Sequence, residues 1–191
     1  MSGHGNRSSK MKSFDFMSTK KKFSKIYHQQ VNNIYRFVYL KIDSPEITED
    51  LTAEVFREFW KIFKKGLDPN SNQKKIKNEK AFLYHLARYK VADYYRAQPD
   101  NKQNLNNDIE IEDQESDLEE QQHTELQKQR LHQALRKIHD NYQDLIIMFY
   151  INDLSVREIA DSLEKSEGAV KTGLHRAREA LKEELSSEEE G

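Results

Sequence analysis

The chain has 191 residues, of which 36% are hydrophobic and 34% are charged, so its length allows one ordinary domain or two small ones. It contains no cysteine, which excludes disulfides, thiol catalysis and cysteine-type zinc sites. The longest apolar run, residues 145–151, is far too short to cross a membrane, and residues 1–12 lack the apolar core of a secretory signal. We therefore expect a cytoplasmic protein without membrane insertion.

The formal net charge of −2 conceals three segments of different charge. Residues 1–99 contain 20 Lys and Arg against 10 Asp and Glu, residues 100–125 contain one Lys against ten acids, and residues 126–191 contain 10 bases against 13 acids. A near-neutral total would argue against nucleic-acid binding, but a segregated charge distribution does not. The segments are therefore interpreted separately.

Residues 20–98 carry apolar side chains at intervals of three or four, the pattern of amphipathic helices. A first helix is predicted over residues 20–42. Pro45 suits the first position of a second helix, which ends near Gly66. A lysine-rich loop leads to a third helix over about residues 80–97. Three helices of this size can close a small core, so we expect one helical domain here.

Residues 99–125 differ in composition from the rest of the chain. They contain few aliphatic side chains among Asn, Gln, Asp and Glu, so they cannot bury enough apolar surface to offset the entropy of ordering. We interpret them as a flexible acidic linker, between the domain of residues 20–98 and a second domain of residues 126–186. A flexible N-terminal arm, residues 1–19, and an acidic tail, residues 187–191, complete the predicted organisation.

The second domain contains the strongest local signal. Ser155 and Glu158 form a capping box at the start of a short helix. A three-residue turn, residues 164–166, leads to a longer helix with an inner stripe of Val170, Leu174, Ala177 and Leu181. Short helix, tight turn and longer helix are typical of a helix-turn-helix. Residues 165–178 hold four bases and one acid, where a DNA-recognition helix needs positive charge.

Two stretches together resemble the extracytoplasmic-function (ECF) branch of the bacterial sigma-70 family of RNA polymerase sigma factors. The first comprises residues 48–60 (TEDLTAEVFREFW), 81–88 (AFLYHLAR) and 93–96 (DYYR), and the second comprises residues 154–160 (LSVREIA), 168–171 (GAVK) and 174–178 (LHRAR). The resemblance covers about residues 20–185. The helix-turn-helix is shared by many regulators, whereas the pair in one short chain is highly specific.

The resemblance implies an all-α, two-domain promoter-recognition subunit that is not an enzyme and needs no cofactor or metal. Its implied partners are core RNA polymerase, promoter DNA and an anti-sigma factor. Core polymerase is expected to dock on Asp50, Leu51, Glu54, Val55 and Trp60, with Phe56 in the domain core. The −10 promoter element is expected at Lys77, Lys80, Tyr84, Arg88, Tyr89 and Arg96, where cations can neutralise phosphates and tyrosine rings can stack on unpaired bases. The −35 element is expected at Ser166, Lys171, Thr172, His175, Arg176 and Arg178.

Three positions depart from the family pattern. Ala53 stands where glutamine is frequent, Glu164-Lys165 replaces a turn of glycine and an aliphatic residue, and Gly173 stands where arginine is common. Glycine inside a helix costs about 1 kcal/mol relative to alanine. Promoter choice therefore cannot be transferred from relatives.

Rival interpretations explain less of the chain. A helix-turn-helix regulator that binds duplex DNA without polymerase accounts for residues 142–185 but not for residues 50–60. A hydrolase or metal enzyme is disfavoured because the seven histidines are scattered, and because no His-Glu-x-x-His, nucleophile-elbow or glycine-rich phosphate motif occurs. A purely structural helical adaptor leaves the basic recognition face unexplained.

Overall fold

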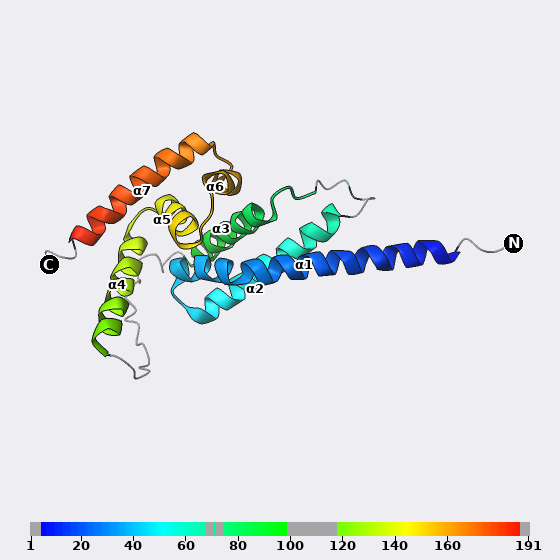
Figure 1. Cartoon of the computed structure of the whole chain (residues 1–191), viewed down its shortest axis with the longest axis horizontal. Helices are drawn as coiled ribbons and strands as arrows, with labels where there is room; N and C mark the ends of the chain where they lie inside the picture. Colours follow the sequence, from blue (N-terminus) through cyan, green and yellow to red (C-terminus); the bar gives the residue numbers. More distant parts are fainter. Residues whose placement is uncertain (1–4, 68–70, 72–74, 99–117, 188–191) are drawn as a thin grey trace.

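The computed structural model describes residues 5–67, 71, 75–98 and 118–187, with side chains described from residue 16 in the first helix and from residue 127 in the fourth. All regular elements in these ranges are helices, which confirms the predicted all-α class (Figure 1). In chain order they are α1 (Gly5–Ile42), α2 (Pro45–Gly66), α3 (Glu79–Ala97), α4 (Leu118–Lys137), α5 (Asp140–Ile146), the π-helix η2 (Ile147–Ile151), α6 (Val156–Leu163) and α7 (Glu167–Ser187). Within the described ranges, no helix has an apolar stretch that could span a bilayer.

The N-terminal unit consists of α1, α2 and α3. Asp43 adopts a left-handed conformation (φ 58°) directly after α1, and the chain reverses there. Ser44 then caps α2, and Pro45 occupies its first turn as predicted, since proline needs no N–H partner at that position. The fully buried side chains of this unit come from all three helices and include Ile34, Phe37, Val38, Val55, Phe59 and Leu83.

The C-terminal unit consists of α4, α5, η2, α6 and α7. Its fully buried side chains include Leu135, Ile147, Met148, Leu154 and Ile159. The sequence predicts one regular helix over about residues 142–152, but the structure forms an α-helix that begins at Asp140 and widens into the π-turn η2. Such π-turns are rare and frequently lie at functional sites.

Two helices begin earlier than the sequence predicts. The first starts at Gly5 instead of near residue 20, and α4 starts at Leu118 instead of near residue 126. Apolar periodicity predicts only the part of a helix that packs against the core. A helix can continue beyond that part, because adding residues to an existing helix requires no new nucleation step. Residues 99–117 of the predicted linker and residues 188–191 of the tail lie outside the described residues, and the domain boundaries stay a prediction.

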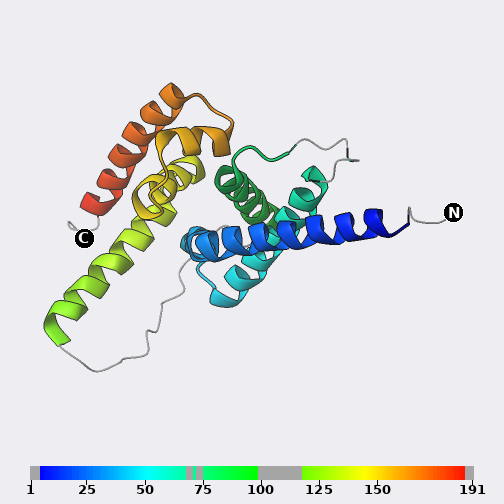
Figure 2. The same cartoon turned by 45° about the vertical axis from the view of Figure 1, so that its right-hand side comes forward.

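The two units pack against each other. Helix α3 contacts α6, and the C-terminal part of α1 contacts α4 and η2. Figure 2 shows α5 and α6 between α7 on one side and the α1–α3 layer on the other. The sequence does not predict this contact, because the polar residues that form it occupy positions that usually face solvent.

Candidate nucleic-acid interface

The helix-turn-helix forms as predicted. The Ser155 hydroxyl accepts a hydrogen bond from the Glu158 N–H at 3.2 Å, and the Ser155 N–H donates to Glu158 Oε2 at 2.8 Å, which closes the capping box. Glu164 ends α6 in a left-handed conformation (φ 54°, ψ 40°), so the turn forms without glycine. The Lys165 N–H donates to the Ala160 carbonyl at 3.0 Å and closes the end of α6. Glu164 therefore takes the place of the glycine that is frequent in this turn, and the cost is the backbone strain of one left-handed non-glycine residue.

Helix α7 presents a basic face to solvent. Val170, Leu174 and Ala177 are buried against the unit's core. The six residues expected to contact the −35 element are all exposed: Ser166, Lys171, Thr172, His175, Arg176 and Arg178. At 100° per residue, those between 171 and 178 occupy one sector of about 160° on the side opposite the buried stripe. This sector can enter a major groove without disturbing the core.

Two members of this surface are also engaged locally. The Ser166 hydroxyl accepts from the Ala169 N–H at 3.2 Å, and the Thr172 hydroxyl donates to the Gly168 carbonyl at 3.1 Å. Ser166 therefore caps α7 and fixes its first turn. Arg176 and Thr172 line a hollow between α7 and α5 that Gly168, Gly173 and Leu145 complete.

Gly173 has a packing reason for standing where the family often has arginine. A Cβ atom added at this position would lie 2.7 Å from Leu145 Cδ1 of α5. Leu145 is only 5% exposed and belongs to the core. The glycine therefore leaves room for the Leu145 side chain of α5 against α7, which gives a packing reason for a residue of poor helix propensity at this position.

The predicted −10 surface divides into three groups on and beside α3. Lys77, Tyr89 and Arg96 are exposed, and the Arg96 guanidinium lies 6.0 Å from the Tyr89 ring centroid. Tyr84 is fully buried, and burial raises the pKa of its phenol. Because a side chain with no exposed surface cannot contact DNA, Tyr84 is a core residue in this conformation and not an available base contact.

Lys80 and Arg88 form the third group. Lys80 Nζ lies 3.1 Å from Glu158 Oε1 of α6, and Arg88 Nε lies 2.6 Å from Asp144 Oδ2 of α5. Both cations are thus paired with carboxylates of the C-terminal unit. Their charge is not free for phosphates in this conformation.

Sequence reasoning missed an aromatic row on α3. The Phe82 and His85 rings stack with centroids 6.0 Å apart, and His85 lies 6.0 Å from Tyr89. Their spacing of three and four residues places the three rings on one helix face. Partly exposed rings in a row beside cations are what unpaired bases stack on. That spacing was the available signal, although Phe82 also fits a core position.

The predicted polymerase surface on α2 is partly available. Asp50 is exposed, and Leu51, Glu54 and Trp60 are half-buried. Lys90 Nζ donates to Glu54 Oε2 at 2.7 Å, and this hydrogen bond lowers the pKa of the Glu54 carboxyl. The Trp60 ring packs against Phe23 at 4.9 Å between centroids.

Two further α2 residues lie in the core. Val55 is fully buried and therefore cannot contact a partner in this conformation, and Phe56 is 3% exposed, in the core position expected for it. The expected surface position of Val55 comes from the family resemblance alone, whereas its place in the apolar stripe of α2 indicates burial.

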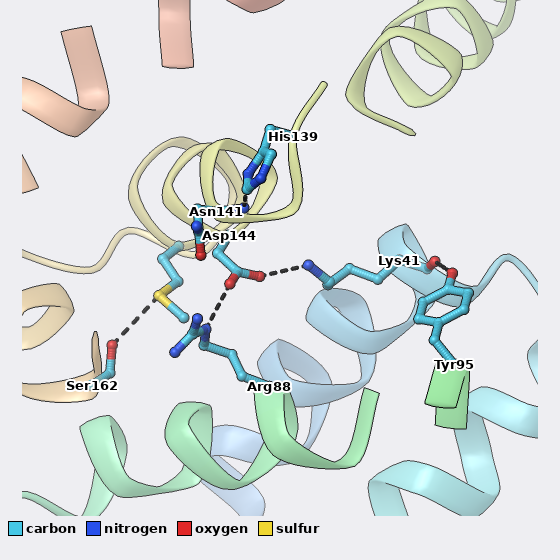
Figure 3. A network of polar contacts seen from close by, with 8 residues as sticks. Lys41, Arg88, Tyr95, His139, Asn141, Asp144 and Ser162 are labelled. Carbon is cyan, nitrogen blue, oxygen red and sulfur yellow. Dashed lines mark hydrogen bonds and ion pairs between the residues drawn. The ribbon is translucent and has the colours of Figure 1, made fainter. Parts of the chain in front are cut away.

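Asp144 is the residue that the sequence did not single out. Its carboxylate accepts from Lys41 Nζ at 2.6 Å and from Arg88 Nε at 2.6 Å, so one acid joins α5 to α1 and α3 (Figure 3). Asp144 is 4% exposed and Lys41 is 7% exposed. Buried charges of this kind persist only when they are paired, as these are. Nothing in the sequence marks Asp144, because its partners are 103 and 56 residues away.

Comparison with known proteins agrees with this geometry. The family described as "Sigma-70, region 4" matches residues 128–181. The ECF RNA polymerase sigma factor BldN of Streptomyces coelicolor is 28% identical over 169 residues, which cover 83% of this chain, and the chain spans only 58% of the length of BldN. The ECF sigma factors SigM and SigX of Bacillus subtilis are 25% and 27% identical, over 82% and 85% of this chain and 91% and 85% of their own lengths.

Two solved structures share the fold. The sigma factor RpoE from Bartonella quintana, in complex with the anti-sigma factor NepR, has a TM-score of 0.61 at 18% identity, covering 87% of this chain and 98% of RpoE. CnrH, in complex with the cytosolic domain of CnrY, has a TM-score of 0.60 at 18% identity, covering 88% of this chain and 90% of CnrH. At this identity the likeness concerns the fold alone.

Proposed function

We propose, from the premise that this chain belongs to the ECF branch of the sigma-70 family, that it binds core RNA polymerase and directs promoter recognition and transcription initiation. The single observation that carries this proposal is the combination of two surfaces in one chain. An exposed basic face on α7 of a helix-turn-helix suits duplex DNA, and a row of aromatic and basic residues on α3 suits single-stranded DNA. A regulator that binds only duplex DNA would use the first surface and not the second.

We propose that the α7 face reads the −35 element. His175 and Thr172 lie near the middle of this face, with Arg176 at one end and Lys171 and Arg178 toward the other. An arginine on a groove-facing helix can bond a guanine edge at two points, whereas a lysine reaches phosphates as a point charge. Arg176 is therefore assigned to sequence readout and Lys171 to positioning.

We propose that the −10 element lies along α3. Lys77, Tyr89 and Arg96 are the exposed residues of the original set, and Phe82 and His85 extend the stacking surface. Lys80 and Arg88 complete it only when the C-terminal unit moves away. Tyr84 supports this surface from beneath as a core residue.

Core polymerase docking is assigned to the carboxylates and apolar edge of α2. Asp50 and Glu54 lie on adjacent turns of one face, with Leu51 and Trp60 beside them. Carboxylates that flank half-buried apolar side chains suit a partner surface formed by helices. An anti-sigma partner and a cytoplasmic location are part of the same proposal, and no catalytic chemistry is assigned to the chain.

The deciding experiment is reconstitution with core RNA polymerase. The chain should co-purify with the core enzyme and support run-off transcription from a promoter selected with the holoenzyme. A chain that binds promoter duplex tightly and specifically without polymerase, and that adds nothing to the core enzyme, would instead be a helix-turn-helix regulator.

A further inference from the structure

Thr172 lies near the middle of the basic face of α7, but its hydroxyl group is bonded to its own helix. The hydroxyl donates to the Gly168 carbonyl at 3.1 Å. A threonine hydroxyl carries a single proton, so this hydrogen bond uses the only donor that the side chain has. The methyl group is therefore the part of this exposed side chain that is not engaged in a hydrogen bond with the helix.

The methyl group of Thr172 has an apolar neighbour on the helix surface. Ala169 is exposed, and its spacing of three residues places it beside Thr172. Both residues line the hollow between α7 and α5, which Leu145 and Gly173 also line. Two methyl groups therefore share one small patch among the cations of the basic face.

Gly173 leaves this pair of methyl groups uncovered. It follows Ala169 by four residues, so a side chain at position 173 would project next to Ala169. A Cβ atom there would lie 2.7 Å from Leu145 Cδ1, and Leu145 would have to shift to admit it. The contact that gives glycine its packing reason thus also leaves an apolar patch where the arginine frequent in the family would present a charge.

Thymine is the base whose major-groove edge such a patch fits. Thymine presents there a carbonyl oxygen and a 5-methyl group, whereas the other three bases present hydrogen-bonding groups without a methyl. The Thr172 hydroxyl does not donate to the thymine oxygen while its proton is engaged with Gly168. Apolar contact with the thymine methyl, which threonine and alanine methyl groups can make, is then the contact that this patch offers.

Helix geometry indicates where that thymine lies. Arg176, which is assigned to a guanine, follows Thr172 by four residues, about 6 Å along the helix axis and about 40° around it. Successive base pairs of duplex DNA are about 3.4 Å apart. The thymine should therefore lie about one or two base pairs from the guanine that Arg176 reads.

We propose that Ala169 and Thr172 form a methyl-reading patch, which takes the 5-methyl group of a thymine in the −35 element beside the guanine assigned to Arg176. The inference rests on the proposed assignment of α7 to the −35 element and adds the base feature that is read. Thr172 is the specificity-determining residue of the patch. A 5-methylcytosine, which carries the same methyl group on a different base, is the other base that the patch accepts.

The first test varies the DNA and leaves the protein unchanged. Each −35 thymine of a promoter selected with the holoenzyme is replaced in turn by uracil, 5-methylcytosine or cytosine, each with its matching partner base. At the position that the patch reads, uracil should weaken holoenzyme binding about fourfold relative to thymine, as expected for one buried methyl group. There, 5-methylcytosine should bind about fourfold more tightly than cytosine. If uracil binds as well as thymine at every position, the proposal is overturned.

The second test exchanges the two groups of the Thr172 side chain. Thr172→Ser keeps the hydroxyl and removes the methyl group, whereas Thr172→Val keeps a methyl group and removes the hydroxyl. Both variants should fold, because Thr172 is exposed, and thermal unfolding checks this. Thr172→Ser should lose the discrimination between thymine and uracil, and Thr172→Val should retain it. Discrimination that persists in Thr172→Ser, or disappears in Thr172→Val, would overturn the proposal.

Failure of this inference can be distinguished from failure of the proposed function. Run-off transcription by the wild-type holoenzyme is measured in parallel, from promoters with and without the −35 element. If transcription depends on that element while uracil has no effect, the sigma-factor function stands and only the methyl readout is lost. If the chain supports no promoter-dependent transcription, the proposed function fails together with the inference that rests on it.

Discussion

Lys80 Nζ of α3 lies 3.1 Å from Glu158 Oε1, the carboxylate that also closes the capping box at the start of α6. One side chain therefore stabilises the helix-turn-helix and contacts the surface assigned to the −10 strand. The two functions can be separated, because glutamine preserves a capping box while it removes the charge.

Glu158→Gln should lower stability in a pH-dependent manner. Burial acts to raise the pKa of the Glu158 carboxyl, but hydrogen bonds from Ser155 and Lys80 outweigh it and lower the pKa below its ordinary value of 4.5. A carboxyl with a lowered folded-state pKa contributes stability that is fully present above the ordinary value and is lost as the pH falls through the folded value. Urea unfolding should show the variant less stable than the wild type at neutral pH, with the difference in stability shrinking as the pH falls below the ordinary value of 4.5. An equal gap at both pH values, or the same behaviour in Glu183→Gln at an exposed site on α7, would refute the assignment.

The recognition helix can be tested at Arg176 and at Lys171, which lie toward opposite ends of its basic face. Arg176→Ala should weaken binding of the holoenzyme at the −35 element by about 1–3 kcal/mol and relax base preference there. Lys171→Ala should weaken all sequences alike and reduce the salt dependence by about one unit. The measurement is binding of holoenzyme to promoters with single −35 substitutions over a range of salt. If Arg176→Ala weakened all sequences alike and Lys171→Ala relaxed base preference, the two roles would be reversed. If neither variant affected −35-dependent transcription, the assignment of α7 to DNA binding would be contradicted.

Charge reversal on α2 tests polymerase docking. The double variant Asp50→Lys and Glu54→Lys should weaken core-polymerase binding by at least about 10-fold, because like charges placed opposite a complementary surface are strongly unfavourable. Far-ultraviolet circular dichroism should remain unchanged, since Asp50 is exposed and Glu54 half-buried. The matched control is Glu179→Lys with Glu183→Lys on exposed α7 positions. Unaltered affinity in a titration with core enzyme would contradict the assignment of polymerase docking to α2.

The two glycines of α7 should respond oppositely to alanine. A Cβ at Gly168 meets only Ser166 Oγ at 4.0 Å, whereas one at Gly173 lies 2.7 Å from Leu145 Cδ1. Gly168→Ala should therefore stabilise the chain by up to about 1 kcal/mol through helix propensity. Gly173→Ala should be less stable than Gly168→Ala by at least about 1 kcal/mol in urea unfolding, because Leu145 is buried and must shift.

A double-mutant cycle checks the stated cause of that difference. Combining Gly173→Ala with Leu145→Ala should show a favourable coupling in urea unfolding, because the smaller side chain removes the overlap. Additive effects would mean that Leu145 is not the neighbour that requires glycine.

Much of this protein was determined by sequence alone. Periodicity predicts the packed parts of α1, α2 and α3, Pro45 marks the start of α2, and Ser155 with Glu158 marks the start of α6. These features are local, because a few neighbouring residues determine a helix cap or an apolar stripe. The same rules placed the exposed basic face of α7 correctly, because the buried stripe of that helix fixes its opposite side.

The tertiary structure alone decided how those elements use their polar residues. Tyr84 and Val55 are buried because of what packs on them, and Lys80 and Arg88 are paired because α5 and α6 lie on α3. Gly173 is explained only by Leu145, which belongs to a different helix. Asp144 joins residues that are 56 and 103 positions distant, and no local pattern records such a contact. Burial and ion pairing are properties of the assembled fold, so they appear only when distant segments meet.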